Sequence, residues 1–203
     1  MANVNRPFGL QPTRGSGSYK FNAQGTLYRV PSTDTTNAYY LGDPVKAAAG
    51  ADANGVSNVV IAAGTDTLRG VITGIMPVYP GVSIQGVPLT LETMNIPATK
   101  THDYYVIVED DPTAEFAVQD DGITTSKLVA ASANLNFSLT ITAGATTSSV
   151  SATVMLSSSL ATTNTLNMKA RGLLQVPGAS FTQYAIWNCR INEHELTGNY
   201  AGV

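Results

Sequence analysis

Two stretches between residues 135 and 156 place an apolar side chain at every second position. The first carries Leu135, Phe137, Leu139 and Ile141, and the second carries Val150, Ala152, Val154 and Leu156. A period of two is that of a β-strand with one buried face. A short run of Gly, Ala and Thr at residues 143–147 separates them. The pattern therefore predicts two half-buried antiparallel strands joined by a short hairpin.

The rest of the chain continues as short β-prone segments bounded by turn residues. We expect about ten to twelve strands in all, the others at residues 25–30, 38–41, 45–49, 56–63, 68–76, 89–94, 103–108, 115–118, 166–174 and 185–192. Gly70 and Gly74 interrupt one apolar run and predict bulges or a sharp bend. One short helix is expected around residues 127–130. The fold class is all-β, with a barrel-like or jelly-roll-like body.

Three regions follow from this pattern. Residues 1–24 contain prolines and glycines without periodicity and are expected to form an extended N-terminal arm. Residues 25–122 are expected to form a barrel-like region that ends at a strong turn signal. Residues 123–203 are expected to form a second β layer, packed with the first as one body.

Charge is sparse and unevenly distributed along the chain. Charged residues make up 12% of 203 residues, and the formal net charge is −3. Residues 1–33 contain no acidic residue but four basic ones, which leaves −7 on the remainder. A surface rich in Thr, Ser, Asn and Ala loses little free energy when it is desolvated, which suits contact with other subunits. The overall acidity argues against a general nucleic-acid binder.

The chain lacks a convincing arrangement for catalysis. Its two histidines, His102 and His194, have only sequence-adjacent carboxylates, which point to opposite faces of a strand. They are interpreted as surface or interface residues. Cys189 alternates with Trp187 and Ile191, and an apolar setting leaves a thiol inert. We therefore expect a packed core cysteine, no catalytic residues and no enzyme activity.

No cofactor or metal is predicted from the sequence. Clustered histidines and cysteines of the kind that hold zinc do not occur. The acidic groups 109–111 and 120–121 have oxygens that could hold calcium, but they lie in expected turns where Asp is common. With one cysteine the chain forms no internal disulfide. Because no apolar run approaches a membrane span and the start has no signal-peptide core, we expect synthesis in a bacterial cytoplasm and no membrane partner.

An ordered set of segments resembles small tailed-bacteriophage virion proteins that decorate or cement the capsid. The segments are MANVNRPFGL at 1–10, LYRV at 27–30, LGDPV at 41–45, NGV at 54–56, LRGVITGI at 68–75, DYYVIV at 103–108, DP at 111–112, EFAVQ at 115–119, INEH at 191–194 and AGV at 201–203. The similarity covers most of the chain in order. Residues 125–160 depart most from the pattern, being richer in Ser, Thr and Ala.

The resemblance implies a structural virion protein on the outer surface of a phage head. Its partners would be the major capsid protein and other copies of itself, as dimers or trimers, with no nucleic acid. It would cement neighbouring capsid subunits and stabilise the shell. Two alternatives are a tail or baseplate component and a carbohydrate-binding receptor module.

The N-terminal arm is the expected capsid-binding element. Its candidate contact residues, both basic and apolar, are Arg6, Pro7, Phe8, Leu10, Arg14 and Lys20. The basic residues could meet an acidic capsid surface, and Phe8 could fill a groove. If the arm only reaches a neighbour, deleting residues 2–20 should leave the body folded and weaken head binding.

Overall fold

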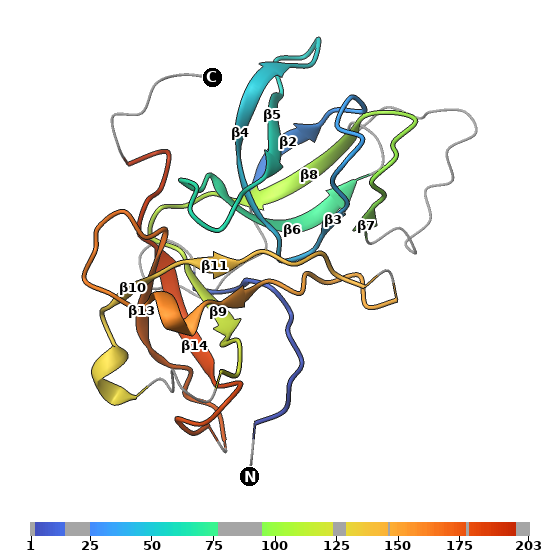
Figure 1. Cartoon of the computed structure of the whole chain (residues 1–203). Helices are drawn as coiled ribbons and strands as arrows, with labels where there is room; N and C mark the ends of the chain where they lie inside the picture. Colours follow the sequence, from blue (N-terminus) through green and yellow to red (C-terminus); the bar gives the residue numbers. More distant parts are fainter. Residues whose placement is uncertain are drawn as a thin grey trace.

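The computed structural model describes residues 3–14, 25–76, 95–123, 129–145, 147–177 and 179–197. The chain is all-β, as predicted (Figure 1). Its strands are β1 (Gln11–Arg14), β2 (Thr26–Val30), β3 (Tyr39–Tyr40), β4 (Pro44–Ala51), β5 (Ser57–Ile61), β6 (Gly70–Met76), β7 (Asn95–Ile96), β8 (Tyr104–Glu109), β9 (Glu115–Gln119), β10 (Asn136–Phe137), β11 (Leu139–Thr140), β12 (Val154–Met155), β13 (Met168–Leu173) and β14 (Ile186–Ile191). Short 3-10 turns lie at η3 (Ala130–Ser132) and η4 (Ser157–Ser159). The expected strand at 89–94 and the first half of the helix expected at 127–130 lie outside the described residues.

A closed five-stranded barrel forms the upper part of the molecule in Figure 1. Its strand order is β2-β5-β4-β6-β8. All neighbours are antiparallel except β2 and β5. The interior is filled mainly by β-branched and aromatic side chains, including Val30, Val45, Val59, Ile72, Val106 and Val108. The register of β6 against β8 shifts between Ile72 and Gly74, which confirms the bulge predicted from the glycines.

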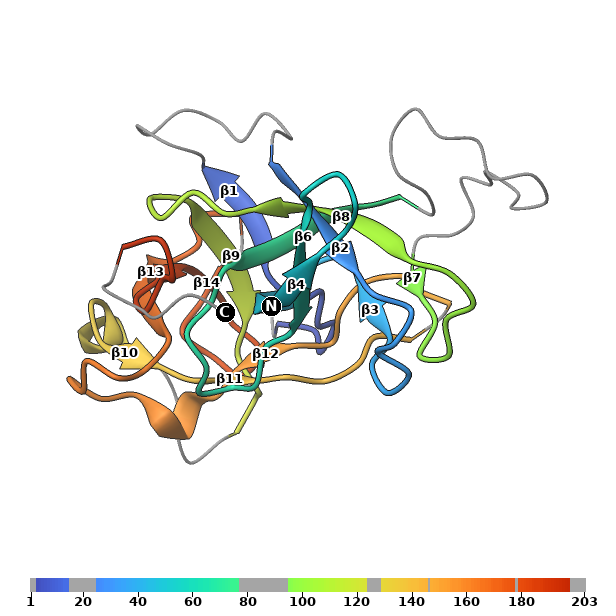
Figure 2. The ribbon, with the colours of Figure 1, turned by 90° about the horizontal axis from the view of Figure 1, so that it is seen from above.

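A five-stranded antiparallel sheet forms the second layer, in the order β1-β9-β14-β13-β10 (Figures 1 and 2). Its buried face carries Trp187, Phe116, Met168 and Cys189, and Val71 of barrel strand β6 packs into the same core. The two layers therefore share apolar contacts and form one body. Strand β9, which falls in the range expected for the barrel, pairs instead with β1 and β14.

The predicted hairpin exists, but one of its strands faces the other way. Leu139 pairs with Met155 and Thr140 with Val154, in antiparallel register. Within the second stretch, however, Ser151, Thr153 and Met155 are fully buried, whereas the expected core residues are only half-buried. Met155 pairs with the core residue Leu139, so both side chains lie on the buried face. A shift of one residue exchanges the two faces of a strand, and Ser151 and Thr153 therefore lie on the buried face with Met155.

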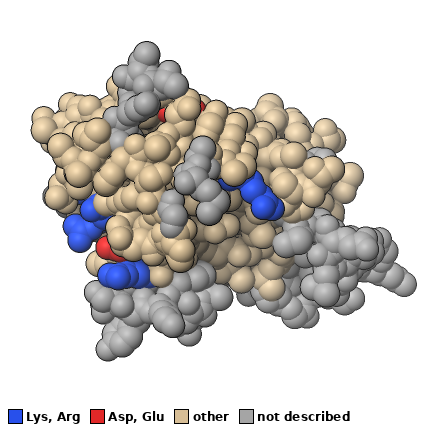
Figure 3. Space-filling model, turned by 90° about the horizontal axis from the view of Figure 1, so that it is seen from below, with Lys and Arg blue, Asp and Glu red and all other residues tan. Residues whose placement is uncertain are grey.

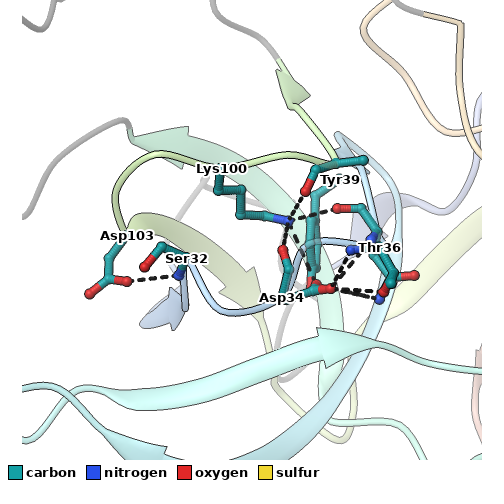
Figure 4. Close-up of polar contacts among 8 residues, drawn as sticks. Ser32, Asp34, Thr36, Tyr39, Lys100 and Asp103 are labelled. Atoms are coloured by element: carbon teal, nitrogen blue, oxygen red, sulfur yellow. Dashed lines mark hydrogen bonds and ion pairs between the residues drawn. The ribbon is translucent and has the colours of Figure 1, made fainter.

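A buried lysine joins two loops at the barrel (Figure 4). Lys100 Nζ donates to the carbonyls of Asp34 at 2.6 Å, Asn37 at 2.7 Å and Ala98 at 3.2 Å. The Asp34 carboxylate lies 3.7 Å from the same ammonium and accepts a hydrogen bond from the Tyr39 hydroxyl. Burial lowers the pKa of Lys100, while the carboxylate opposes that shift. The ammonium thereby satisfies carbonyls that would otherwise be buried without donors.

Candidate interaction surface

Residues 3–14 lie against the body of their own chain. The Asn3 amide donates to the Thr182 hydroxyl at 2.9 Å and to the Gln183 carbonyl at 3.1 Å. The Gln119 side chain holds residues 4–6 in place, because its carbonyl accepts the Arg6 N–H and its amide donates to the Val4 carbonyl. Strand β1 then pairs antiparallel with β9. The N-terminal segment is thus an integral edge of the five-stranded sheet.

A tight crossing fixes the middle of this segment. Leu10 N–H donates to the Gly42 carbonyl at 2.9 Å, and Leu10 is completely buried. Gly9 has φ +71°, and a Cβ there would lie 2.6 Å from both the Gly42 oxygen and the Ser151 Cβ. The expectation that Leu10 anchors a neighbouring protein is therefore corrected, because its side chain already belongs to the chain's own core.

The other predicted arm residues stand at separate places. Arg6 and Arg14 are exposed, whereas Pro7 and Phe8 are half-buried. Phe8 lines a cavity of about 190 Å³ between the N-terminal segment, the barrel and Val150. Arg14 Nε lies 3.9 Å from a Glu115 carboxylate oxygen. Lys20 lies outside the described residues.

Exposed apolar side chains gather around the N-terminal segment. Val4 is 75% exposed, Phe181 42% and Ile123 43%. Hydrogen bonds connect their segments, since Asn3 binds the loop at 180–183 and the Gln183 amide donates to the Gly122 carbonyl. Seen from below, the described part of the surface is largely uncharged, with Lys and Arg at a few separate places (Figure 3). We call Val4, Ile123 and Phe181 the lower apolar patch.

The two histidines have different environments. His102 is half-buried and stacks on Tyr104 with ring centroids 4.4 Å apart. His194 is only 1% exposed, so its interpretation as a surface or interface residue is wrong. Burial lowers the pKa of His194 to about 4, and its Nδ1 accepts the Leu196 N–H at 3.1 Å. The neutral imidazole of His194 is therefore packed inside the molecule, just after the end of β14 and beside the segment that leads into β6.

Cys189 is a packed core residue, as predicted. It is completely buried, and its thiol donates to the Phe116 carbonyl at 3.2 Å. Burial raises the pKa of the thiol strongly. A thiol in this state is a poor nucleophile.

The acidic groups considered for calcium have protein partners. Asp110 accepts from the hydroxyls of Thr26 and Tyr28. Asp120 accepts from the backbone of Gly122, Tyr184 and Ala185. Within the described residues, no group of three or more His, Cys, Asp or Glu side chains is placed to hold a metal ion. None of the described helical segments is long and apolar enough to cross a membrane.

Comparison with known proteins gives no relative. No family model, no curated protein and no solved structure matches the chain. Function must therefore be inferred from the surface itself.

Proposed function

We propose that this chain is a structural protein of a bacteriophage virion that binds the outer surface of the head. It would bridge neighbouring copies of the major capsid protein, with its own copies associating as dimers or trimers, and so stabilise the shell. The observation that carries the proposal is the lower apolar patch, whose three side chains are exposed on an all-β body with few charged residues. The ordered sequence resemblance to capsid-decorating proteins supports the same role.

The physical basis is the low cost of desolvation. Exposed apolar groups such as Val4 and Phe181 gain free energy when they leave water. Their surroundings carry few charges, so few ions lose hydration on docking. Many copies on a lattice then act together, and modest single contacts are sufficient.

Decoration of heads tests the proposal. The purified chain would be mixed with undecorated heads of the phage that encodes it, and binding would be followed by co-sedimentation and electron microscopy. We expect regular density on the outer surface and higher heat stability of the decorated heads. Labelled virions with density on the tail would favour the alternative tail or baseplate role, and tight glycan binding would favour a receptor module.

Substitutions in the patch connect this experiment to the structure. Val4→Asp and Phe181→Asp place a charge within the lower apolar patch and should weaken decoration. Leu196→Asp is the matched control, because Leu196 is also 50% exposed but lies beyond β14, where the N–H of the preceding Glu195 donates to the Leu68 carbonyl. Equal decoration by all three variants would remove the patch from the proposal.

A further inference from the structure

A row of charged side chains crosses the outer face of the five-stranded sheet. Lys169 on β13 is directly opposite Arg190 on β14, and Arg190 is directly opposite Glu115 on β9. Glu115 in turn is paired with Arg14 on β1. Directly opposite residues project from the same face of a sheet. The row therefore presents three cations and one carboxylate across four strands, on the side away from the core.

Arg171 adds a fourth cation to this row. It lies at the register shift between Ala170 and Gly172, and its Nε lies 3.5 Å from a Glu115 carboxylate oxygen. Glu115 is thus shared by Arg14 and Arg171, whose side chains are 59% and 45% exposed, while its own side chain is only 15% exposed. Four of the 11 basic residues of an acidic chain meet here around one recessed acid.

Two of these cations lie outside the ion pairs of Glu115. Lys169 and Arg190 form no ion pair with the described residues; Arg190 is exposed and Lys169 is half-buried. Like charges directly opposite each other on neighbouring strands destabilise a sheet, and only Glu115, opposite Arg190, offsets this repulsion. A local arrangement that costs stability is typical of a surface used for binding.

We propose that this basic row, Lys169, Arg190, Arg14 and Arg171 around Glu115, binds an acidic segment of a protein on the phage head. The identity of that partner rests on the proposed function. Guanidinium groups pair with carboxylates in a planar, two-point manner, and neighbouring strands set the cations about 5 Å apart. Along one face of an extended acidic segment, carboxylates recur about every 7 Å, within reach of these long basic side chains.

The chemistry of the row favours an acidic protein segment over nucleic acid. No aromatic side chain of β1, β9, β13 or β14 lies on this outer face, because Phe116 and Trp187 are both completely buried in the core. Stacking platforms for single-stranded bases are therefore missing from these strands.

Neutralising Lys169 and Arg190 tests the inference. The variant carrying Lys169→Gln and Arg190→Gln keeps both ion pairs of Glu115 and removes the like-charge contact, so its thermal stability should equal or exceed that of the wild type. Its affinity for undecorated heads should fall roughly tenfold at low salt. The difference should shrink near 0.5 M salt, where the screening length falls to about 4 Å. Lys46→Gln, in barrel strand β4, is the matched control and should bind as the wild type does.

The outcomes separate this inference from the proposed function. If wild type and double variant decorate heads equally at every salt concentration, head binding stands and the basic row is not a docking surface. If the wild type does not decorate heads, the proposed function fails, and immobilised poly-glutamate and a DNA duplex become the probes. Retention on poly-glutamate that is lost in the double variant would support an acidic protein partner. Preference for DNA, or retention on neither, would overturn it.

Discussion

The barrel and the five-stranded sheet are assembled from the chain in different ways. All five barrel strands come from one stretch, from β2 at residue 26 to β8 at residue 109. The sheet collects β1 from the N-terminal segment, β9 from the middle and β10, β13 and β14 from the C-terminal third. Pairs such as Gln11 with Ala117 and Cys189 with Phe116 must close long loops before they contribute.

The difference also explains where the molecule can bind partners. A closed barrel has no free edge, whereas the sheet ends at β1 and β10. Pro12 within β1 has no N–H to offer a further strand, which limits uncontrolled edge pairing. Both the lower apolar patch and the basic row belong to the sheet half. The barrel serves as the locally folded support for a sheet that carries the interaction surfaces.

The largest expected effect comes from the contact between the N-terminal segment and the sheet core. Leu10→Ala should lower the free energy of unfolding by about 4 kcal/mol, because it leaves a cavity at a completely buried position. Trp187 is the single tryptophan and lies in the same core, so its fluorescence reports unfolding of the sheet half. Loss of the Trp187 signal at lower denaturant should accompany the change.

Val4→Ala is the control for this experiment, because Val4 belongs to the same segment and is 75% exposed. Its effect should be within about 0.5 kcal/mol. A Leu10→Ala variant as stable as Val4→Ala would show that the segment is a loosely attached arm after all. The same reasoning reverses the expectation for deleting residues 2–20, which should now destabilise the sheet rather than leave the body intact.

The crossing at Gly9 should give the next largest effect. Gly9→Ala places a methyl group 2.6 Å from the Gly42 oxygen and Ser151 Cβ, and should cost about 3 kcal/mol in thermal or denaturant unfolding. Gly55→Ala is the matched control in the barrel. Gly55 also has positive φ, +83°, but its Cβ would meet nothing within 4 Å, so the change should cost only about 1 kcal/mol. Equal effects at the two sites would mean that backbone conformation, not the crossing, limits stability.

The barrel strands could be predicted because their signals are local. The run at 68–76 and its glycines identify both the strand β6 and its bulge. The alternation at 185–192 likewise gives β14 and the burial of Cys189. In each case the side-chain pattern and the strand occupy the same few residues, so no partner has to be known.

The interaction surface could not be predicted in the same way. Alternation places Lys169 and Arg190 on one face of each strand, but their meeting with Arg14 depends on pairing of β1 with β9 and of β9 with β14, between segments about 100 and 75 residues apart in sequence. Leu10 lies in an aperiodic segment, and the sequence around such an apolar residue does not show which core its side chain enters. For Ser151 and Met155, the pairing of Met155 with Leu139, not the polarity of the side chains, determines which face of the strand is buried.

A smaller and more local effect is expected in the barrel half. Lys100→Met keeps the length of the side chain but leaves three carbonyls without a donor, and should cost about 2 kcal/mol. Because the cluster lies between loops at residues 34–39 and 98–100, amide hydrogen exchange should rise there while Trp187 fluorescence keeps its transition shape. Loss of protection spread equally over β9 and β14 would contradict the view of two separately stabilised halves.

The smallest effect should come from Asp43, where the two halves meet. Asp43 is 2% exposed and accepts the Tyr40 N–H at 2.8 Å, and burial raises its pKa to about 6. Because the pKa of Asp43 is raised in the folded state, the contribution of Asp43 to the free energy of unfolding is fully present below about pH 4. It is lost as the pH rises through 6. Asp43→Asn removes the buried charge and keeps an acceptor for Tyr40. The variant should therefore be more stable than wild type at pH 7.5, and the difference should shrink as the pH falls to 4.

Asp66→Asn gives the opposite sign and completes the test of Asp43. Hydrogen bonds from Lys46 and the Ala63 N–H hold the pKa of Asp66 below its usual value against the effect of burial. The contribution of Asp66 to stability is present above the ordinary aspartate pKa and is lost as the pH falls below it. Asp66→Asn should therefore be less stable than wild type at pH 7.5 and approach the wild-type stability at low pH. Denaturant unfolding of both variants from about pH 2 to pH 8 measures the two slopes, that of Asp43 between pH 4 and 7 and that of Asp66 below pH 4. Parallel slopes would mean that Asp43 is hydrated in solution, and that the junction between barrel and sheet is open to water.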